Sequence, residues 1–241
     1  IFKIEFMIPS VNLEASFKGK ATLERFSGGY FASQVPQQAQ AEINFADKAL
    51  IQQLKAAAKT QPAMTYRFEQ NGSIVTIFAD GKAAHSSTPE DGVNAVTHLA
   101  QLLAIHQWPK NTASLTQQFI HEMVGMGIYA EQFGDIAYKD DFMGPMSLVP
   151  TIVKTGKQGT QVMIKRRRPI GKTPERLDRQ AHEALERWQQ KHQVKLAKIE
   201  TYWGKPMVMQ DAPHLNTLLD VYSHFTGVKD PQPVAIGGST N

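Results

Sequence analysis

The chain has 241 residues, 41% of them hydrophobic, which is enough for one large domain or two smaller cores. Charged residues make up 20% and the formal net charge is +4, so the composition excludes a disordered polyelectrolyte and gives no sign of a dedicated nucleic-acid binder. Cysteine is absent, which excludes a disulfide framework, a thiolate metal site and a cysteine nucleophile. No apolar run approaches the ~20 residues that cross a bilayer, so we expect a soluble protein with no membrane partner. We place it in the cytoplasm, with the periplasm as the alternative.

The first half of the chain contains both strand and helix patterns. Alternation of apolar and polar residues predicts half-buried strands at residues 1–8, 21–26, 39–45, 64–70 and 73–78. Helical spacing of apolar residues predicts helices at residues 46–60 and 92–107. The last two strands meet at Asn71-Gly72, which indicates a tight hairpin because both residues tolerate the positive φ of its turn positions.

A similar order of elements returns in the second half. The patterns predict helices at residues 112–126 and 173–191, and strands at residues 143–153, 161–167 and 195–203. Thr173 and Pro174 are typical of the cap and first position of the long helix. We therefore predict an α+β fold of two ferredoxin-like halves, residues 1–110 and 111–203, each an antiparallel sheet with helices packed on one face.

The two ends of the sequence suggest a piece of a longer protein. The chain begins at Ile1 inside an alternating pattern and stops at Asn241 just after a glycine turn, and such a turn normally leads into another element. Residues 204–241 hold only a predicted helix at 213–225 and a predicted strand at 233–236, which is too small a unit to fold alone. We therefore divide the chain into a domain of residues 1–203 and a partial segment, residues 204–241, of another domain.

The most informative histidine lies between a predicted strand and a predicted helix. His85 stands among small residues in the run Gly81-Lys82-Ala83-Ala84-His85-Ser86-Ser87-Thr88-Pro89. A loop at such a junction can present side chains to a ligand, and the amides at a helix start attract anions. From the local residues alone, two interpretations remain: a functional histidine, or one that only caps or packs at the junction. The local pattern by itself favours packing.

Four motifs, taken together, change that balance. They are Ser27-Gly28-Gly29 with Val35-Pro36, the His85 run continued by Gly92 and Asn94-Ala95, Arg167-Arg168-Pro169 with Gly171 and Thr173, and Ile236-Gly237-Gly238-Ser239. In content and order they resemble motifs of the di-zinc exopeptidase family that includes aminoacylase, carnosinase, glutamate carboxypeptidase and the PepV-like dipeptidases. The resemblance spans nearly the whole chain. Two positions depart from the family pattern, with Ser33 in place of an asparagine and Arg168 in place of a tyrosine.

The resemblance implies a function for residues 1–203 and a role for several side chains. This part would be the lid, or substrate-clamping, domain of a zinc metallopeptidase, a hydrolase that cleaves dipeptides or short peptides with a free C-terminal carboxylate. His85 would stabilise the oxyanion, which makes it the candidate catalytic residue. The candidate substrate-binding residues, which would hold the carboxylate, are Arg167, Ser33, Gly237, Gly238 and Ser239. We expect the lid to close on the remainder of the catalytic domain through hinges near residues 1–10 and 203–206.

The metal ligands of the resembled family are missing from this sequence. In the family, a His-x-Asp pair, an aspartate, a Glu-Glu pair and another acid precede the lid, and a histidine follows the glycine turn. His121-Glu122 and His182-Glu183 both lack the second histidine that a zinc-binding helix needs one turn later. We therefore expect two zinc ions in the full-length parent, no catalytic metal site in this chain, and no activity from the chain alone.

A basic run at residues 165–168 allows two interpretations. Lys165-Arg166-Arg167-Arg168 could contact phosphates, but it lies at the end of a predicted strand, where alternate side chains face opposite sides. If Arg167 matches the arginine of the resembled family, as the resemblance implies, it would bind a substrate carboxylate in a bidentate pair, while Arg166 and Arg168 point elsewhere. We prefer this interpretation to nucleic-acid binding, because no nucleic-acid-binding motif accompanies the run.

A second function from a different class remains open. Antiparallel sheets of the predicted kind expose edges that can pair with another chain. The chain could therefore be a non-catalytic binding or dimerisation module, with a homodimer as its partner.

Overall fold

The architecture comes from a computed structural model that describes residues 3–12, 17, 19–207 and 212–234. Its main strands are β1 (Lys3–Pro9), β2 (Thr22–Gly28), β3 (Gln38–Asn44), β4 (Thr65–Asn71), β5 (Ile74–Asp80), β8 (Ser147–Gly156), β9 (Gly159–Arg167) and β10 (Ala197–Tyr202). Two short strands, β6 (Lys139–Asp140) and β7 (Gly144–Pro145), pair only with each other. The helices are α1 (Lys48–Ala58), α2 (Ala95–Leu103), α3 (Thr112–Phe119), α4 (Pro174–His192) and α5 (Leu215–Thr226).

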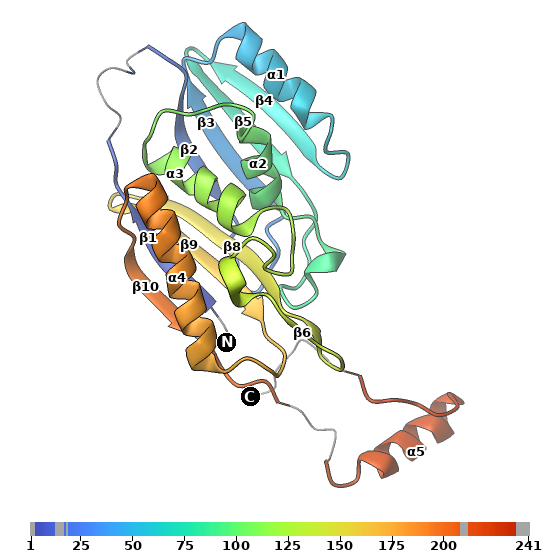
Figure 1. Cartoon of the computed structure of the whole chain (residues 1–241). Coiled ribbons are helices and arrows are strands. Elements are labelled where there is room, and N and C mark those ends of the chain that lie inside the picture. Colours follow the sequence, from blue (N-terminus) through green and yellow to red (C-terminus); the bar gives the residue numbers. More distant parts are fainter. Residues whose placement is uncertain (1–2, 13–16, 18, 208–211, 235–241) are drawn as a thin grey trace.

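The eight main strands form one sheet in the order β10-β1-β9-β8-β2-β3-β5-β4. Every neighbouring pair in this sheet is antiparallel. Figure 1 shows the sheet running from β4 beside α1 to β10 beside α4. The predicted α+β class, an antiparallel sheet with helices packed on it, is thus confirmed.

The sheet consists of two groups of strands that meet at a narrow joint. Between β2 and β8 the register holds the single pair Gly28 and Val153, whereas the other neighbours pair along most of their length. A Cβ atom on Gly28 would lie 2.6 Å from Val96 Cγ2, so α2 packs directly against this joint. We expected a separate sheet in each half, but the structure joins the two groups because the edges of β2 and β8 pair with each other.

The first strand lies among the strands of the second half. Lys3 of β1 stands opposite Lys165 of β9 on one side and opposite Tyr202 of β10 on the other. The two groups of strands therefore differ from the expected ranges 1–110 and 111–203, since β1 joins the later group. Local alternation predicts that a segment is a strand but carries no information about a partner so distant in sequence.

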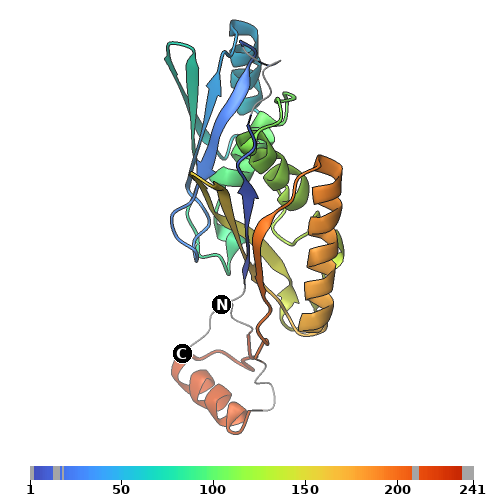
Figure 2. The same cartoon turned by 90° about the vertical axis from the view of Figure 1, so that its left-hand side faces the viewer.

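Helices cover one face of the sheet. Along β9, Val162, Ile164 and Arg166 are buried, whereas the alternate residues are half-buried, as expected when only one face is covered. In Figure 2 the orange helix α4 stands on one side of the strands, and α2 and α3 contact the sheet from the same layer of the core. Among the described residues, no helix covers the opposite face.

Most predicted elements exist, with shifted ends. The hairpin at Asn71-Gly72 is confirmed, and Gly72 has a φ of 58°. Thr173 caps α4 by accepting a hydrogen bond from the Arg176 amide at 3.2 Å. The helix predicted at 112–126 ends at Phe119 as α3 and continues as a π-helix to Val124, before Gly125 at a φ of 68°. Residues 233–234 are in no strand, and the rest of the strand predicted at 233–236 lies outside the described residues.

The helix α5 differs from the other helices in its exposure. None of its residues is buried, and Figure 1 shows it apart from the sheet. Within the described part of the chain, no helix is long and apolar enough to cross a membrane.

Candidate functional site

The turn after β2 is built on two glycines that approach the neighbouring strand closely. Gly29 has a φ of +77°, and a Cβ atom there would lie 2.0 Å from the carbonyl oxygen of Thr151 on β8. Only glycine fits such a close backbone approach with positive φ. The Ser27-Gly28-Gly29 motif therefore allows the loop before Ser33 to pack closely against β8.

Ser33 and His85 lie on two loops that are held together by backbone hydrogen bonds. The Ser86 amide donates to the Ser33 carbonyl at 2.8 Å, and the Val35 amide donates to the Ala84 carbonyl at 2.9 Å. Between these bonds, Gln34 and His85 form an isolated antiparallel bridge. Both Ser33 and His85 are exposed. The structure thus brings together two of the predicted site residues, from the connection after β2 and the connection after β5.

The hydrogen bonds of His85 fix which ring nitrogen carries the proton in its neutral form. The Ser87 amide donates to His85 Nδ1 at 3.2 Å, and Ser87 Oγ lies 2.7 Å from the same nitrogen. Because a nitrogen that accepts an N–H bond holds no proton, we assign the proton of neutral His85 to Nε2. That Nε2–H group is a donor available to a ligand.

The residues around His85 anchor its loop to the start of α2. Lys82 and Val93 form a second isolated bridge, and a Cβ atom on Gly81 would lie 2.2 Å from the Val93 carbonyl oxygen. Asn94 caps α2 through its side-chain oxygen, which accepts from the Val96 amide at 3.0 Å. The glycines and asparagine of this motif therefore hold the loop in place, with His85 exposed on it.

Arg167 lies at the end of β9, opposite Ser147 of β8. It is half-buried, and its Nη2 atom is buried without a hydrogen-bond partner. Its neighbours Arg166 and Arg168 are 3% and 5% exposed and point toward the covered face, as alternation along a strand requires. No ion pair joins these three arginines to a carboxylate among the described residues.

The His85 loop and the end of β9 are linked through β8. Asn94 Nδ2 donates to the Pro150 carbonyl at 3.1 Å, and Ser147, which faces Arg167, lies three residues earlier on the same strand. Three residues of a strand span about 10 Å, so both groups belong to one end of the sheet joint. No hydrogen bond connects Arg167 directly to His85 or Ser33 among the described residues, and Gly237, Gly238 and Ser239 lie outside them.

Two hollows in the surface are lined by side chains other than those of the candidate site. One of 390 Å³ lies behind the His85 loop, between Pro89, the segment at Tyr129 and β8 at Pro150. A larger one of 730 Å³ lies on the open face over the joint, beside Tyr30 and Lys154. Neither is lined by His85, Ser33 or Arg167. His85 and Ser33 are thus exposed on the surface outside both hollows.

The described residues do not fit a metal site. No group of three or more His, Cys, Asp or Glu side chains among them could hold a metal ion.

The sequence reasoning missed a buried cluster around Arg166. The guanidinium Cζ lies 3.3 Å from the centroid of the Trp203 ring, and Arg166 Nη2 donates to the Tyr202 carbonyl at 2.6 Å. Burial lowers the pKa of Arg166, and the negative charge of Asp178 opposes that shift. The alternation of the basic run placed Arg166 on the covered face, but no local signal identified Trp203 as its partner.

The fold and these loops define a class: an antiparallel α+β domain that displays a histidine loop and an arginine on one end of its sheet joint. Residues 69–192 match the peptidase dimerisation domain family. The chain belongs to this family, the dimerisation domain of M20 peptidases, whose members are generally metal-dependent.

Two relatives are dipeptidases by name. The Beta-Ala-Xaa dipeptidase of Lactobacillus delbrueckii subsp. lactis is 27% identical over 247 residues, covering 100% of this chain and 48% of the relative. A putative dipeptidase of Staphylococcus saprophyticus subsp. saprophyticus is 27% identical over 183 residues, covering 70% of this chain and 35% of the relative. The chain therefore spans half or less of the length of these relatives.

Proposed function

We propose that residues 1–203 are the lid of a dipeptidase and that His85 and Arg167 are its principal substrate contacts. In this proposal, His85 donates a hydrogen bond to the carbonyl oxygen of the scissile peptide as negative charge develops there. Arg167 binds the free carboxylate of the substrate, with Ser33 and the amides of residues 237–239 as further donors.

The single observation that carries this proposal is the hydrogen bonding of His85. A histidine that only packs at a junction needs neither exposure nor a defined tautomer, yet His85 is exposed and its Nδ1 is occupied by the Ser87 amide. The remaining Nε2–H group makes no hydrogen bond among the described residues. A donor that is fixed before the substrate arrives costs no reorganisation during the reaction, which is what stabilisation of an oxyanion requires.

Arg167 supports the same assignment from the other side of the joint. It lies on the face of β9 opposite Arg166, and its partly buried guanidinium has an Nη2 atom with no partner. A carboxylate would satisfy this group through a bidentate pair, which is the strong form of such contacts.

The exposed helix α5 supports a second domain in the parent. Its residues Leu218, Val221, Tyr222 and Phe225 recur at helical spacing, and 48% to 81% of each is exposed. An amphipathic stripe of this kind normally packs on a core. We propose that residues 204–241 belong to a catalytic domain, that this domain holds two zinc ions outside the described residues, and that the chain alone is inactive.

The experiment compares the full-length parent with the present chain on two substrates, β-alanyl-alanine and its C-terminal amide. The first substrate is suggested by the name of one relative. We expect the parent to hydrolyse the free dipeptide, to lose that activity when metal is chelated, and to act poorly on the amide. Equal rates on both substrates would contradict the carboxylate clamp, and activity of the chain alone would contradict the lid assignment.

A second candidate function is dimerisation, favoured by the matched family. The edge strands β4 and β10 each leave one side unpaired in the sheet. If the chain acts only as a dimerisation module, light scattering should show a dimer whose mass is halved by charged substitutions on one edge. A monomer at all concentrations would remove this candidate.

A further inference from the structure

We infer that Arg166 is a positioning residue, which couples the carboxylate-binding Arg167 to the chain segment that leaves the lid after Trp203. This inference rests on the proposed function, since it assumes that Arg167 binds substrate. The carrying observation is the contact of the buried side chains of Arg166 and Trp203 with each other and of Trp203 with the half-exposed Asp178, hereafter the Arg166 cluster.

Arg166 links β9 to β10 and to the residue that follows β10. It belongs to β9, its guanidinium stacks on the Trp203 ring with Cζ 3.3 Å from the centroid, and its Nη2 donates to the Tyr202 carbonyl of β10 at 2.6 Å. Arg166 is 3% exposed and Trp203 is 8% exposed. Stacking of a guanidinium on an indole in a desolvated setting is worth about 2 kcal/mol. The side chain therefore ties the end of β10 to β9, although β1 lies between these two strands in the sheet.

Asp178 of α4 binds the same tryptophan through its indole N–H group. Trp203 Nε1 donates to Asp178 Oδ1 at 2.9 Å, and the Thr201 hydroxyl donates to the same carboxylate oxygen. The ring is thus fixed by a cation on one strand and a carboxylate on the helix. These two contacts of the Trp203 side chain together restrict the backbone at residue 203.

The Arg166 cluster lies where the lid meets both neighbouring segments. Lys3, the first described residue, stands between Lys165 of β9 and Tyr202 of β10. Figure 1 shows the start of β1 and the ends of β9 and β10 at the same end of the sheet. Residues 204–207 follow directly. A hinge movement of the lid would therefore first displace the residues at this end of the sheet.

Arg167 is adjacent to Arg166 and faces the other side of the strand. A fixed Arg166 side chain restricts the peptide group between Arg166 and Arg167. The Arg167 side chain therefore leaves the backbone in a defined direction. Arg166 Nε and Nη1 are buried without partners and less than 1 Å² of each is accessible, so they are not placed to contact a substrate. Arg166 therefore acts through its neighbour.

The test uses the full-length parent with four variants. Arg166→Met removes the guanidinium, and Trp203→Phe keeps the stacked ring but loses the bond to Asp178. Arg167→Ala removes the proposed clamp, and Arg179→Met is the matched control, because Arg179 is next to Asp178 on α4 but its side chain is 68% exposed. Kinetics on β-alanyl-alanine and amide hydrogen exchange at residues 163–169 and 201–207 are measured for each, with metal content and thermal unfolding as checks of integrity.

A positioning role predicts a specific pattern. Arg166→Met should raise KM about tenfold with kcat changed less than about threefold, and Trp203→Phe should do the same more weakly. Both variants should speed exchange in both segments, and Arg179→Met should leave kinetics and exchange unchanged.

The outcomes separate the two hypotheses. If Arg167→Ala raises KM while Arg166→Met and Trp203→Phe leave it unchanged, the positioning role is wrong and the proposed clamp stands. If Arg167→Ala leaves KM unchanged, the clamp itself is wrong. Faster exchange at residues 201–207 alone, without a change at 163–169, would also overturn the coupling.

Discussion

His85 faces Gln34 across an antiparallel bridge, and this pairing places Ser33 beside the histidine. The Ser86 amide, which donates to the Ser33 carbonyl at 2.8 Å, extends the contact. Two loops that follow different strands are thereby fused into one short ribbon. In the proposed function Ser33 contacts the substrate carboxylate and His85 the oxyanion, so this pairing would set the distance between the two contacts.

Replacing His85 should affect turnover more than binding. If the Nε2–H group donates to the oxyanion only as charge develops, His85→Ala in the full-length parent should lower kcat about a hundredfold or more, with a much smaller change in KM. Steady-state kinetics with zinc occupancy checked measures this. His85→Gln, which keeps a donor, should recover part of the rate. Full turnover in the alanine variant would show that the histidine only packs at the junction.

Replacing Arg167 should affect binding. A carboxylate clamp acts on the bound substrate as well as on the transition state, so Arg167→Ala should raise KM markedly. Lys165→Ala is the control, because Lys165 is a cation on the same face of β9, two residues earlier. Equal effects of the two changes would indicate a general electrostatic contribution and contradict a specific clamp.

The chain alone should bind no catalytic zinc. Among the described residues no three potential ligands converge, and structural metal sites need such a preformed or foldable set. Isothermal titration of zinc into the chain should show no stoichiometric site of nanomolar affinity. A tight site with one or two ions per chain would mean that ligands have been overlooked.

The sequence could predict the elements better than their assembly. The hairpin at Asn71-Gly72 and the cap at Thr173 follow from turn and capping preferences that act over a few residues. The joint at Gly28 and Val153 and the insertion of β1 between β9 and β10 depend on pairing between distant segments, which leaves no local pattern.

The candidate site shows the same division. The position of His85 between a strand and a helix was readable, because small residues and a helix start surround it. Its tautomer was not, since that depends on the Ser87 amide. Alternation along the strand likewise predicted that Arg166 and Arg168 face away from Arg167. The stacking of Arg166 on Trp203 could be seen only in the fold.

Gly29 should tolerate no side chain. Its φ of +77° and the 2.0 Å approach of a Cβ atom to the Thr151 carbonyl combine strain with a backbone clash. Gly29→Ala should therefore lower the free energy of unfolding by about 3 kcal/mol, measured by urea denaturation. Gly72→Ala is the matched control, with a φ of +58° but nothing within 4 Å of the Cβ atom, and should cost only about 1 kcal/mol. Similar losses for both variants would show that the joint adapts easily.

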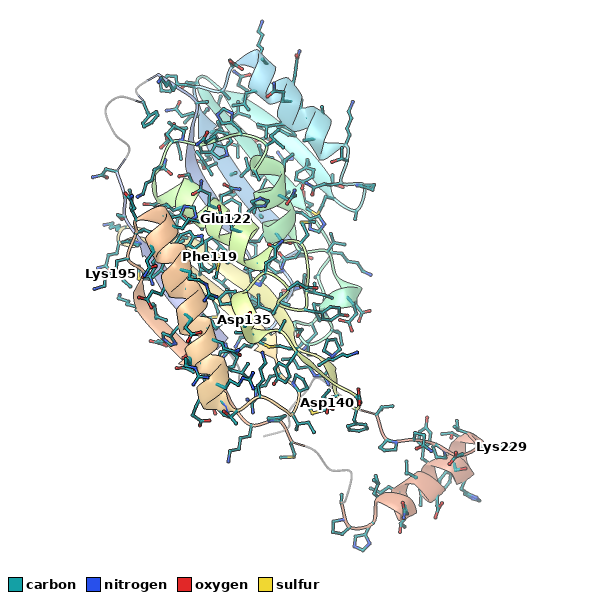
Figure 3. All side chains as sticks on the ribbon, viewed as in Figure 1. Phe119, Glu122, Asp135, Asp140, Lys195 and Lys229 are labelled. Atoms are coloured by element: carbon teal, nitrogen blue, oxygen red, sulfur yellow. The ribbon has the colours of Figure 1, made fainter. Side chains whose placement is uncertain are left out.

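Glu122 should make the stability of the chain depend on pH in the acidic range. Figure 3 shows Glu122 near Phe119 beside α4. Its carboxylate lies 2.7 Å from His192 Nε2 and 3.1 Å from Lys191 Nζ. Burial by itself would raise the pKa of Glu122, but the hydrogen bonds and charges of His192 and Lys191 outweigh it, so the pKa is lowered from 4.5.

The sign of the effect follows from this shift. A carboxyl group whose pKa is lower in the folded state stabilises the fold above its unfolded pKa, and that contribution is lost as pH falls through the folded value. At pH 7 we expect Glu122→Gln to lower the free energy of unfolding by about 1 kcal/mol. The difference from the unsubstituted chain should shrink below pH 4.5 and vanish once the carboxyl is protonated. Urea denaturation of both proteins from pH 7 to pH 3 measures it, and a difference that stays constant over this range would mean that the glutamate contributes by packing and not by charge.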